Sequence, residues 1–445
     1  MPIEEKFVEK KLSAPLEQQK MTVYQWFTVG MCVFLNIIDG FDVLVMAFTA
    51  SAISQEWGLS GAQIGFLFSA GLVGMAGGSL FIAPWADKMG RKPIVLICLA
   101  VSGVSMLFSA AAASVWQLGI LRFITGLGIG GILVSSNVLT SEYASAKWRS
   151  LAVSLQSTGY AIGASLGGVL AIYLISQLGW RSVFFSGGLV TCAFVAVAYV
   201  WLPESLSFLL VKQPRGALLK ANRIHARVGL PQLAALPNTD GIQATRVSGI
   251  RSLFAPTLKV STLAIWGAFF CVMFGFYFIV SWTPKLLASA GMSAEQGIKI
   301  GIWLNVGAMF GAILIGYLGT RFNIKAVHIG FLFVTSVLMG VFAYVLDQLS
   351  LAVVVGFLLG VLANGAVAGL YAITPTIYDV GHRASGVGAA IGVGRAGGIV
   401  SPLVAGVLLD RHWQAAQLFV FYALIFVVAI AMVMLLQRQA NKAGI

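Results

Sequence analysis

Residues 24–48 read YQWFTVGMCVFLNIIDGFDVLVMAF, and this stretch decides the fold of the chain. Its only charged residues are Asp39 and Asp42. An apolar run of about 20 residues, wound as a helix, crosses a hydrocarbon core roughly 30 Å thick. The stretch therefore predicts a transmembrane helix that carries two carboxyl groups.

Runs of the same kind recur along the whole chain. The 445 residues are 59% hydrophobic and 10% charged, which is too apolar for a surface covered by water. Strands of a β-barrel would alternate polar and apolar residues, whereas these runs are apolar on every side. We expect an all-α integral membrane protein with twelve transmembrane helices, at residues 24–48, 64–84, 94–113, 116–139, 151–175, 183–201, 260–282, 301–318, 327–345, 351–373, 386–409 and 418–436.

Basic residues indicate how these helices are oriented. If the N-terminus lies in the cytoplasm, most of the 28 Lys and Arg fall in cytoplasmic segments, and the outside loops hold only Arg181, Lys285, Lys299 and Arg411. This distribution obeys the positive-inside rule, so the net charge of +13 requires no nucleic-acid partner. Residues 1–20 are too polar for a cleavable signal, and we expect both termini in the cytoplasm.

A hydrophilic stretch divides the chain into two similar halves. Residues 86–92 read ADKMGRK after the second helix and residues 319–325 read GTRFNIK after the eighth, an offset of about 235 residues that indicates an internal repeat. The central stretch is basic, and we interpret it as a partly helical connector. We expect five parts: a cytoplasmic N-terminal segment (1–22), a six-helix bundle (23–202), a cytoplasmic loop (203–257), a second six-helix bundle (258–437) and a cytoplasmic tail (438–445).

Glycines at helical spacing mark the fifth and eleventh helices. Small residues let helix backbones approach closely in lipid. Because the two groups occupy equivalent places in the repeat, we expect them to pack between the halves. The glycines are Gly159, Gly163 and Gly167 in the fifth helix, and Gly388, Gly392, Gly394 and Gly398 in the eleventh.

Asp39 and Asp42 form the most informative group. Ionisable residues inside a membrane are costly and persist mainly where they face a cavity or a partner. The two acids are three residues apart and share one helical face, and Gly40 leaves room for a neighbouring helix. Two carboxyl groups in a low dielectric do not readily ionise together, so one can carry a proton. We predict a proton-coupling pair; the alternative is a fixed buried pair with Arg122.

Arg122 and Arg395 are the cations within the predicted helices. Arg122 opens the run RFITGLGIG at residues 122–130, and its planar guanidinium suits either an aspartate or a substrate carboxylate. We interpret Arg395 as the corresponding cation of the second half, which either contacts substrate or belongs to a buried structural pair. Uncharged polar groups at membrane depth complete the predicted substrate-binding set: Tyr277, Asn305 and Asn137.

Charged residues at the cytoplasmic helix ends form a second candidate group. They are Asp87, Arg91, Glu142 and Arg149. We predict that they link the second, third and fourth helices in a gate that breaks when the inner side opens. The alternative is charge that only marks a membrane boundary.

Signatures of enzymes are missing from the sequence. It contains neither a His-Glu-x-x-His zinc motif nor a phosphate-binding Gly-Lys-Ser/Thr loop. The four histidines lie at or near predicted loops and form no metal-binding pattern. We expect no catalytic residues, no cofactor and no metal site, and we do not expect ATP-driven transport.

Several of these motifs together resemble a known family. Residues 87–92 and the run at 122–130 are similar to two signatures of the major facilitator superfamily. Residues 39–42, 141–143 and 202–205 (DGFD, SEY and LPES) resemble its aromatic acid:proton symporter family. The likeness covers the whole chain and implies the major facilitator fold, a benzoate-like or hydroxybenzoate-like substrate, and a requirement for Asp39, Asp42, Asp87, Arg122, Glu142 and Arg395.

This sequence departs from the family pattern at two places. Ala83 stands where the loop signature usually has its first Gly. Thr320 stands where the second-half copy often has Asp. The gate of the second half is therefore expected to lack a charge.

The combined expectation is a transporter of the bacterial inner membrane. It would import an aromatic carboxylate by proton symport with alternating access, with the anion on Arg122 and Arg395 closing from the opposite half. Two alternatives remain open: a non-aromatic carboxylate such as cis,cis-muconate, and a non-transporting membrane sensor that signals through the loop at residues 203–256. We expect a monomer whose partners are the carboxylate, protons and the lipid bilayer.

Overall fold

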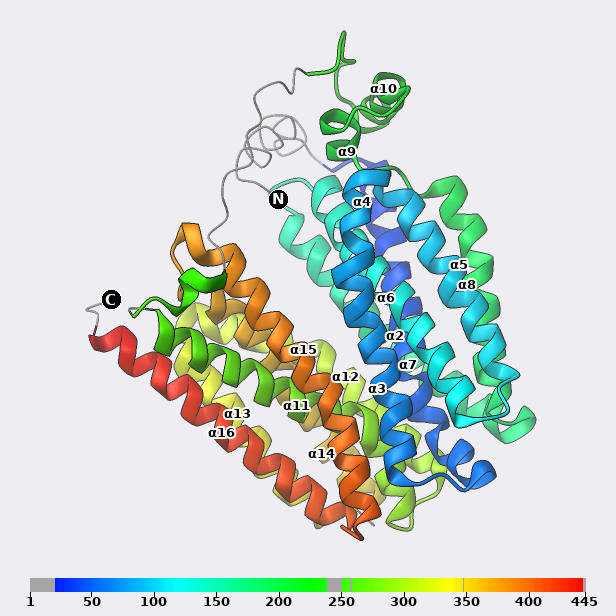
Figure 1. The fold of residues 1–445 in the computed structure, drawn as a ribbon, viewed down its shortest axis with the longest axis vertical. Coiled ribbons are helices and arrows are strands. Elements are labelled where there is room, and N and C mark those ends of the chain that lie inside the picture. Colours follow the sequence, from blue (N-terminus) through cyan, green and yellow to red (C-terminus); the bar gives the residue numbers. More distant parts are fainter. Residues whose placement is uncertain (1–20, 238–249, 257, 347, 443–445) are drawn as a thin grey trace. The chain divides into compact units, whose positions relative to one another are not determined.

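The computed structural model describes residues 21–237, 250–256, 258–346 and 348–442. Parts of the predicted N-terminal segment (1–20), of the central loop (238–249) and of the tail (443–445) lie outside the described residues. Within the described residues the regular structure is helical, which confirms the predicted fold class. Figure 1 shows the course of the chain.

Long helices follow one another through short connections (Figure 1). In the first half they are α2 (Val23–Trp57), α3 (Gly61–Gly77), α4 (Ala83–Met89), α5 (Arg91–Ala110), α6 (Val115–Tyr143), α7 (Arg149–Leu178) and α8 (Arg181–Trp201). In the second half they are α11 (Lys259–Ser289), α12 (Ala294–Arg321), α13 (Ile324–Phe342), α14 (Leu349–Ile373), α15 (Val380–Asp410) and α16 (Ala415–Lys442). Shorter elements are η1 (Gly78–Ile82), α9 (Leu206–Val211), α10 (Ala217–Val228), η2 (Ile250–Phe254) and η3 (Thr374–Thr376).

The number of transmembrane segments agrees with the sequence. In the described part of the chain, 12 helical segments are long and apolar enough to cross a membrane. Each coincides with one of the predicted runs, and most extend several residues beyond it. The extra turns carry polar residues, because a helix continues past the hydrocarbon core as long as its backbone hydrogen bonds can form.

The second segment shows why a predicted end differs from the observed one. We expected it to end at Pro84, but the chain runs from α3 through the π-helical turn η1 into α4, and Pro84 lies in the first turn of α4. Proline is tolerated there because the N–H that it lacks would have no partner within the helix. As a result, Asp87 lies in a helix rather than in a loop.

Glycine contacts confirm the internal repeat. Gly163 on α7 lies against the backbone of Ile37 on α2, and Gly397 on α15 lies in the same way against Phe270 on α11. The two pairs are about 234 residues apart, as expected for a duplicated unit. A second set repeats at the same offset: Gly74 with Phe123, Gly78 with Leu127, Gly307 with Phe357 and Gly311 with Val361.

These contacts also correct the prediction for the glycine clusters. Gly159 and Gly163 pack against α2, which belongs to their own half of the sequence, and Gly394 packs against α11 of its own half. Gly388 and Gly392 have open space around them. The prediction of packing between the halves is therefore wrong for Gly159, Gly163 and Gly394, because they serve the close approach of neighbouring helices within one repeat. For Gly388 and Gly392 it stays a prediction.

The contacts within the chain define two units. The first comprises the described residues of Met1–Val43, Val73–Gly163 and Phe184–Arg246, and the second those of Leu44–Leu72, Ala164–Val183 and Val247–Ile445. In the first unit α5 packs against α6, and in the second α11 packs against α15 and α16 while α12 packs against α14. The predicted bundles, at residues 23–202 and 258–437, are each one continuous stretch of sequence, whereas each of these units combines several segments. The boundaries of the bundles stay a prediction.

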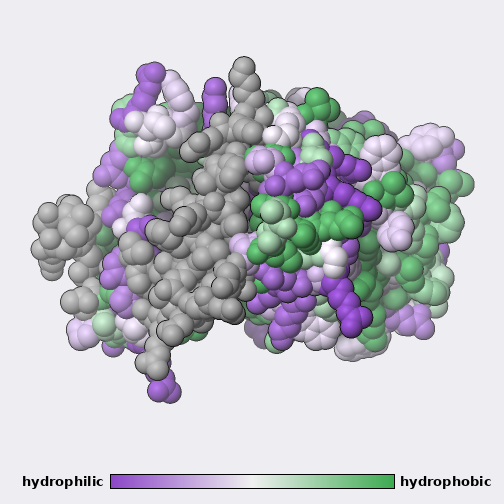
Figure 2. Space-filling view, turned by 90° about the horizontal axis from the view of Figure 1, so that it is seen from above, coloured by the Kyte–Doolittle hydropathy of each residue, from purple (hydrophilic) through white to green (hydrophobic). Residues whose placement is uncertain are grey.

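Two short helices, α9 and α10, form much of the described part of the central loop, as the interpretation of a partly helical connector predicted. α10 is amphipathic: Ala221, Ile224 and Val228 are buried, while Arg223 and Arg227 are exposed. Figure 2 looks onto the end of the molecule that carries these helices, where hydrophilic side chains gather around hydrophobic ones. Such a helix suits a place beside a membrane boundary.

Candidate functional site

Asp39 and Asp42 lie on α2 in the first unit. They are 1% and 2% exposed. None of their four carboxyl oxygens has a hydrogen-bond partner among the described residues. A buried carboxyl group without partners is far more costly when charged than when protonated. Arg122 is near enough to Asp42 to interact with it electrostatically, but none of the four oxygens is held by a hydrogen bond among the described residues.

Gly40 determines how closely another helix covers these acids. Its position faces the main-chain carbonyl of Tyr160 on α7 so closely that a Cβ atom would overlap with it. Helix backbones come this near only where the residue is small. The contact places α7 directly against the stretch of α2 that carries both acids.

Arg122 reaches from α6 to the same stretch of α2. Its Nη1 donates a hydrogen bond of 3.3 Å to the main-chain oxygen of Asp42, and its Nη2 donates one of 3.0 Å to Oγ1 of Thr125. The guanidinium carbon lies 5.0 Å from the centre of the Phe184 ring. Its Nε has no partner among the described residues, and neither carboxylate accepts a hydrogen bond from it. Arg122 thus contacts an aspartate through the main-chain oxygen of Asp42 rather than through its carboxylate.

Arg395 lies on α15 in the second unit and is half-buried. Its Nη1 is buried without a hydrogen-bond partner among the described residues. Tyr277 on α11 and Tyr371 on α14 lie close enough to interact with it electrostatically. The repeat relates Arg395 to Ala161, about 234 residues earlier, rather than to Arg122. Its interpretation as the counterpart of Arg122 is therefore wrong: the two cations lie on non-equivalent helices.

The two predicted asparagines have different surroundings. Asn305 on α12 is 4% exposed, and its Nδ2 donates a hydrogen bond of 2.8 Å to the main-chain oxygen of Gly301 in the same helix. Asn137 on α6 is exposed. At a rise of 1.5 Å per residue, Asn137 lies roughly 22 Å along the helix axis from Arg122. One small aromatic acid therefore cannot contact both residues at once.

Asp87, Arg91 and Glu142 of the predicted gate meet in one cluster of the first unit. Arg91 is 7% exposed and forms ion pairs with Asp87 at 3.3 Å and with Glu142 at 3.4 Å. Arg149 donates a hydrogen bond of 3.0 Å from Nε to the main-chain oxygen of Ser141. The structure thus joins the ends of α4, α5 and α6 through Arg91 and holds Arg149 against the end of α6.

Glu204 belongs to this cluster, although the sequence assigned it no role. Its Oε1 accepts hydrogen bonds from the main-chain nitrogens of Arg91 at 2.7 Å and Lys92 at 3.2 Å, where α5 begins. Gly90, with a φ of 103°, allows the sharp turn before α5, and a Cβ atom there would lie 2.5 Å from Glu204. A carboxylate at a helix N-terminus is stabilised by the free N–H groups and the helix dipole. In the sequence, residues 202–205 carry only the resemblance to the family. Glu204 is more than 100 residues away from the start of α5, so no local pattern connects the two.

Comparisons with known proteins place this chain in a family. The profile of the Major Facilitator Superfamily matches residues 30–352 and, in an overlapping second segment, residues 305–444. The chain belongs to this superfamily. A gallate transporter of Pseudomonas putida is 34% identical over 416 residues, which cover 92% of this chain and 91% of the relative. The 4-hydroxybenzoate transporter PcaK of Pseudomonas aeruginosa is 33% identical over 427 residues, 94% of each chain.

The solved structures support the same assignment at the level of the fold. The xylose transporter XylE of E. coli, in a partially occluded inward-open conformation, has a TM-score of 0.72 at 17% identity and covers 92% of this chain and 97% of its own. Within the superfamily, the curated relatives put the chain among the aromatic acid transporters. It is therefore a multi-pass membrane transporter and not an enzyme.

This major facilitator chain has a further set of contacts that the sequence did not predict. In the second unit, Asp410 at the end of α15 accepts hydrogen bonds from the main-chain nitrogens of Gly61 at 2.6 Å and Ala62 at 2.9 Å, where α3 begins. Gly406 lies against the backbone of Gly61, and Ser69 Oγ donates a hydrogen bond of 2.7 Å to Ile399. We call these contacts the α3–α15 seam. No local signal could reveal it, because its partners are separated by more than 300 residues.

Proposed function

We propose that this transporter imports an aromatic carboxylate of the benzoate or hydroxybenzoate class by proton symport with alternating access. The observation that carries the proposal is the pair of buried acids without partners, Asp39 and Asp42, next to a buried cation that bonds to the main chain of Asp42. Such a group can take up a proton on an acid and an anion on the cation, because Arg122 donates no hydrogen bond to either carboxylate among the described residues.

Arg122 is the proposed site for the substrate carboxylate. Its guanidinium is oriented by Thr125 and the Asp42 carbonyl, and its Nε is free of partners among the described residues. A planar guanidinium binds carboxylates through parallel hydrogen bonds. Phe184, whose ring lies against the guanidinium, adds an aromatic surface beside the anion site. The group therefore offers contacts to both parts of an aromatic acid.

Coupling follows from electrostatics within this group. An anion bound at Arg122 adds negative charge beside Asp39 and Asp42 and so favours their protonation, and by linkage the proton favours the anion. One proton with one monovalent anion is electrically neutral, so the pH gradient alone would drive transport. A second proton would add about 2.3 kcal/mol per 100 mV of membrane potential.

Arg395 and Tyr277 are the proposed contribution of the second unit. A half-buried guanidinium with an unpartnered nitrogen suits a carboxylate, and Tyr277 supplies both a ring and a hydroxyl beside it. Asn305 and Asn137 are proposed as further contacts along the transport path rather than as partners of the same carboxylate as Arg122.

The names of the relatives support the substrate class. The curated proteins similar to this chain include transporters of gallate, 4-hydroxybenzoate and, in Acinetobacter baylyi, benzoate. We propose that the chain acts as a monomer in the inner membrane with both termini in the cytoplasm, as its distribution of Lys and Arg favours. The cluster around Arg91 is proposed as the cytoplasmic gate.

Counterflow in proteoliposomes tests the substrate class. Vesicles preloaded with labelled 4-hydroxybenzoate would be diluted into benzoate, 4-hydroxybenzoate, protocatechuate, gallate or cis,cis-muconate. We expect exchange with one or more of the aromatic acids and none with muconate. Arg122→Ala should abolish it, whereas Glu295→Gln should not, because Glu295 is an exposed acid paired only with Lys299 on the surface of α12. Exchange with muconate alone would contradict the proposal.

Symport is tested separately from substrate choice. An inward pH gradient without a membrane potential should drive accumulation of the acid, and a membrane potential without a pH gradient should not, if one proton accompanies one anion. Accumulation that follows neither gradient would contradict proton symport while leaving the transport of aromatic acids intact.

A further inference from the structure

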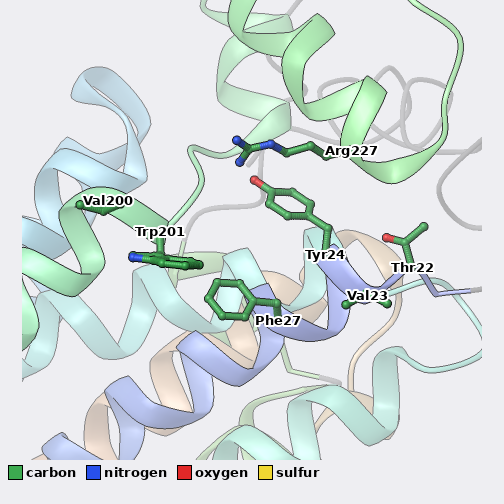
Figure 3. Close-up of a pocket in the computed structure, with 7 residues that line it drawn as sticks. All are labelled: Thr22, Val23, Tyr24, Phe27, Val200, Trp201 and Arg227. Carbon is green, nitrogen blue, oxygen red and sulfur yellow. The ribbon is translucent and has the colours of Figure 1, made fainter.

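A pocket in the first unit lies apart from the acids and cations of the proposed transport site. It has a volume of about 670 Å³. Figure 3 shows its lining residues. They come from the start of α2, the end of α8 and the connector helix α10: Thr22, Val23, Tyr24, Phe27, Val200, Trp201 and Arg227. Because α2 begins and α8 ends here, the pocket lies where transmembrane helices leave the hydrocarbon core.

One wall of the pocket is apolar and exposed. Val23, Val200 and Trp201 are 87%, 69% and 55% exposed, and Phe27 packs its ring 5.3 Å from that of Trp201. In a protein surrounded by lipid, exposed apolar side chains on transmembrane helices face acyl chains. Trp and Tyr are typical of the membrane–water interface, where a ring contacts lipid and a polar atom contacts water. This wall fits an acyl chain at the level where it joins its headgroup.

The opposite wall carries a cation. Figure 3 shows Arg227 extending from α10 toward the ring of Tyr24. Its guanidinium carbon lies 5.2 Å from the ring centre. Among the described residues no carboxylate forms an ion pair with it. Stacking on a ring leaves the edge of the guanidinium free to donate hydrogen bonds, and this edge matches the oxygens of a phosphate. The cation therefore stands beside the apolar wall at the depth of lipid headgroups.

We propose that this pocket binds an anionic phospholipid, with its phosphate at Arg227 and an acyl chain along Val23, Phe27, Val200 and Trp201. The lipid would link α10 of the connector to the ends of α2 and α8. Arg227 favours an anionic over a zwitterionic lipid, because the charge of an anionic phosphate headgroup is not already balanced by a cation of its own.

The pocket suits a lipid better than the transported acid. A substituted benzene ring with one carboxylate would fill only a small part of 670 Å³ and would leave the exposed apolar wall uncovered. A free phosphate ion would use Arg227 but none of the aromatic side chains. A phospholipid uses both walls at once.

Thermal unfolding of the purified full-length protein in detergent tests the proposal. Dioleoyl-phosphatidylglycerol, dioleoyl-phosphatidylcholine, inorganic phosphate and 4-hydroxybenzoate would each be titrated. We expect phosphatidylglycerol to raise the melting temperature more than phosphatidylcholine does, and inorganic phosphate at the same concentration to have no effect. Arg227→Ala should weaken the apparent affinity for phosphatidylglycerol about fivefold, and Arg227→Lys less, because it keeps the charge.

Arg223→Ala is the matched control. Arg223 is an exposed arginine one turn earlier on α10 that does not line the pocket, so it should keep the wild-type response. Val200→Glu, which adds a negative charge to the apolar wall without touching Arg227, should weaken phosphatidylglycerol binding too and provides an independent variant.

Several outcomes would overturn the proposal. Equal losses in Arg223→Ala and Arg227→Ala would indicate a general effect of surface charge. Equal stabilisation by inorganic phosphate would indicate a site for a free anion. Loss of the response to 4-hydroxybenzoate in Arg227→Ala, with the phosphatidylglycerol response unchanged, would assign the pocket to the transported acid.

Discussion

Two groups of charged residues in the first unit differ in whether their acids form ion pairs or hydrogen bonds. In the cluster around Arg91, this residue pairs with Asp87 and Glu142, and Glu204 caps the start of α5. In the membrane, Asp39 and Asp42 have no partners among the described residues. Both groups contain acids and an arginine, so their residue types alone do not distinguish them.

The difference indicates what each group can do. A network of ion pairs and hydrogen bonds holds helices in one arrangement, and it must be broken for them to move. Unsatisfied buried acids do not stabilise the fold, so their presence calls for a ligand or a proton at some stage of the working cycle. The cluster around Arg91 is suited to holding helix ends together, and the pair Asp39 and Asp42 is suited to binding a ligand or a proton.

The largest expected effect is that of removing the cation beside the unsatisfied acids. Arg122→Ala should lower the initial rate of 4-hydroxybenzoate uptake by about 100-fold or more, since a hydrogen bond to a charged group contributes about 1.5–3 kcal/mol and two are lost. Arg122→Lys keeps the charge but not the planar fork and should recover only part of the rate. Uptake by Arg122→Ala at the wild-type rate would show that this group does not bind the substrate.

A second expected effect concerns the α3–α15 seam. Asp410→Ala removes both hydrogen bonds to the start of α3 and should shift the population in which the seam is open by about tenfold, or about 1.4 kcal/mol. Asp410→Asn should shift it less, because an amide oxygen still accepts one bond. Labelling of Ala62→Cys by a maleimide, in a background without the native cysteines, measures the change, because Ala62 joins the seam through its main-chain nitrogen and the substitution keeps that hydrogen bond. Equal labelling in all variants would mean that the seam does not open.

Removing the cap from the cluster around Arg91 should have a moderate effect on stability. Glu204→Ala leaves the main-chain nitrogens of Arg91 and Lys92 without their acceptor and should cost about 1 kcal/mol. Glu204→Gln keeps an acceptor and should cost only a few tenths of that amount. Thermal unfolding of the purified variants compares them, and a Gln variant as unstable as the Ala variant would show that charge rather than capping matters.

The smallest expected effect is on stability and concerns Asp379, an exposed residue of the second half. Hydrogen bonds from His382 hold the pKa of Asp379 below its usual range. Stabilisation by this carboxylate is therefore complete above the ordinary Asp pKa of about 3.9 and disappears as the pH falls through the lowered value. Compared with Asp379→Asn, the wild type should lose its small advantage in melting temperature only in acid. A difference that grows as the pH falls would have the wrong sign.

Much of the fold was predictable because lipid imposes a strong constraint on the sequence. Each of the twelve runs had to be long and apolar, and the repeat appeared as motifs at a fixed offset. Asp39, Asp42 and Arg122 were predictable for the same reason: a charged residue is conspicuous in an apolar run. The ends of the helices were less predictable. The second segment, for example, continues past Pro84 through η1 into α4.

The rest depends on which distant residues meet. Glu204 caps a helix more than 100 residues away, and Asp410 caps one more than 300 residues away. Neither contact leaves a pattern in the local sequence. The sequence also could not show that Arg395 corresponds to Ala161. One arginine in each half suggests that the two occupy equivalent positions of the repeat, and only the glycine contacts give the offset that relates the two halves.

Accumulation of labelled 4-hydroxybenzoate in proteoliposomes under an inward pH gradient tests the central claim most directly. The variants are Asp39→Asn, Asp42→Asn and their combination, with Glu295→Gln as the control. We expect the double variant, and at least one single variant, to exchange substrate but to reach no more than equal concentrations on the two sides, because the proton carrier is lost. Accumulation by all three variants to the wild-type level would contradict the account.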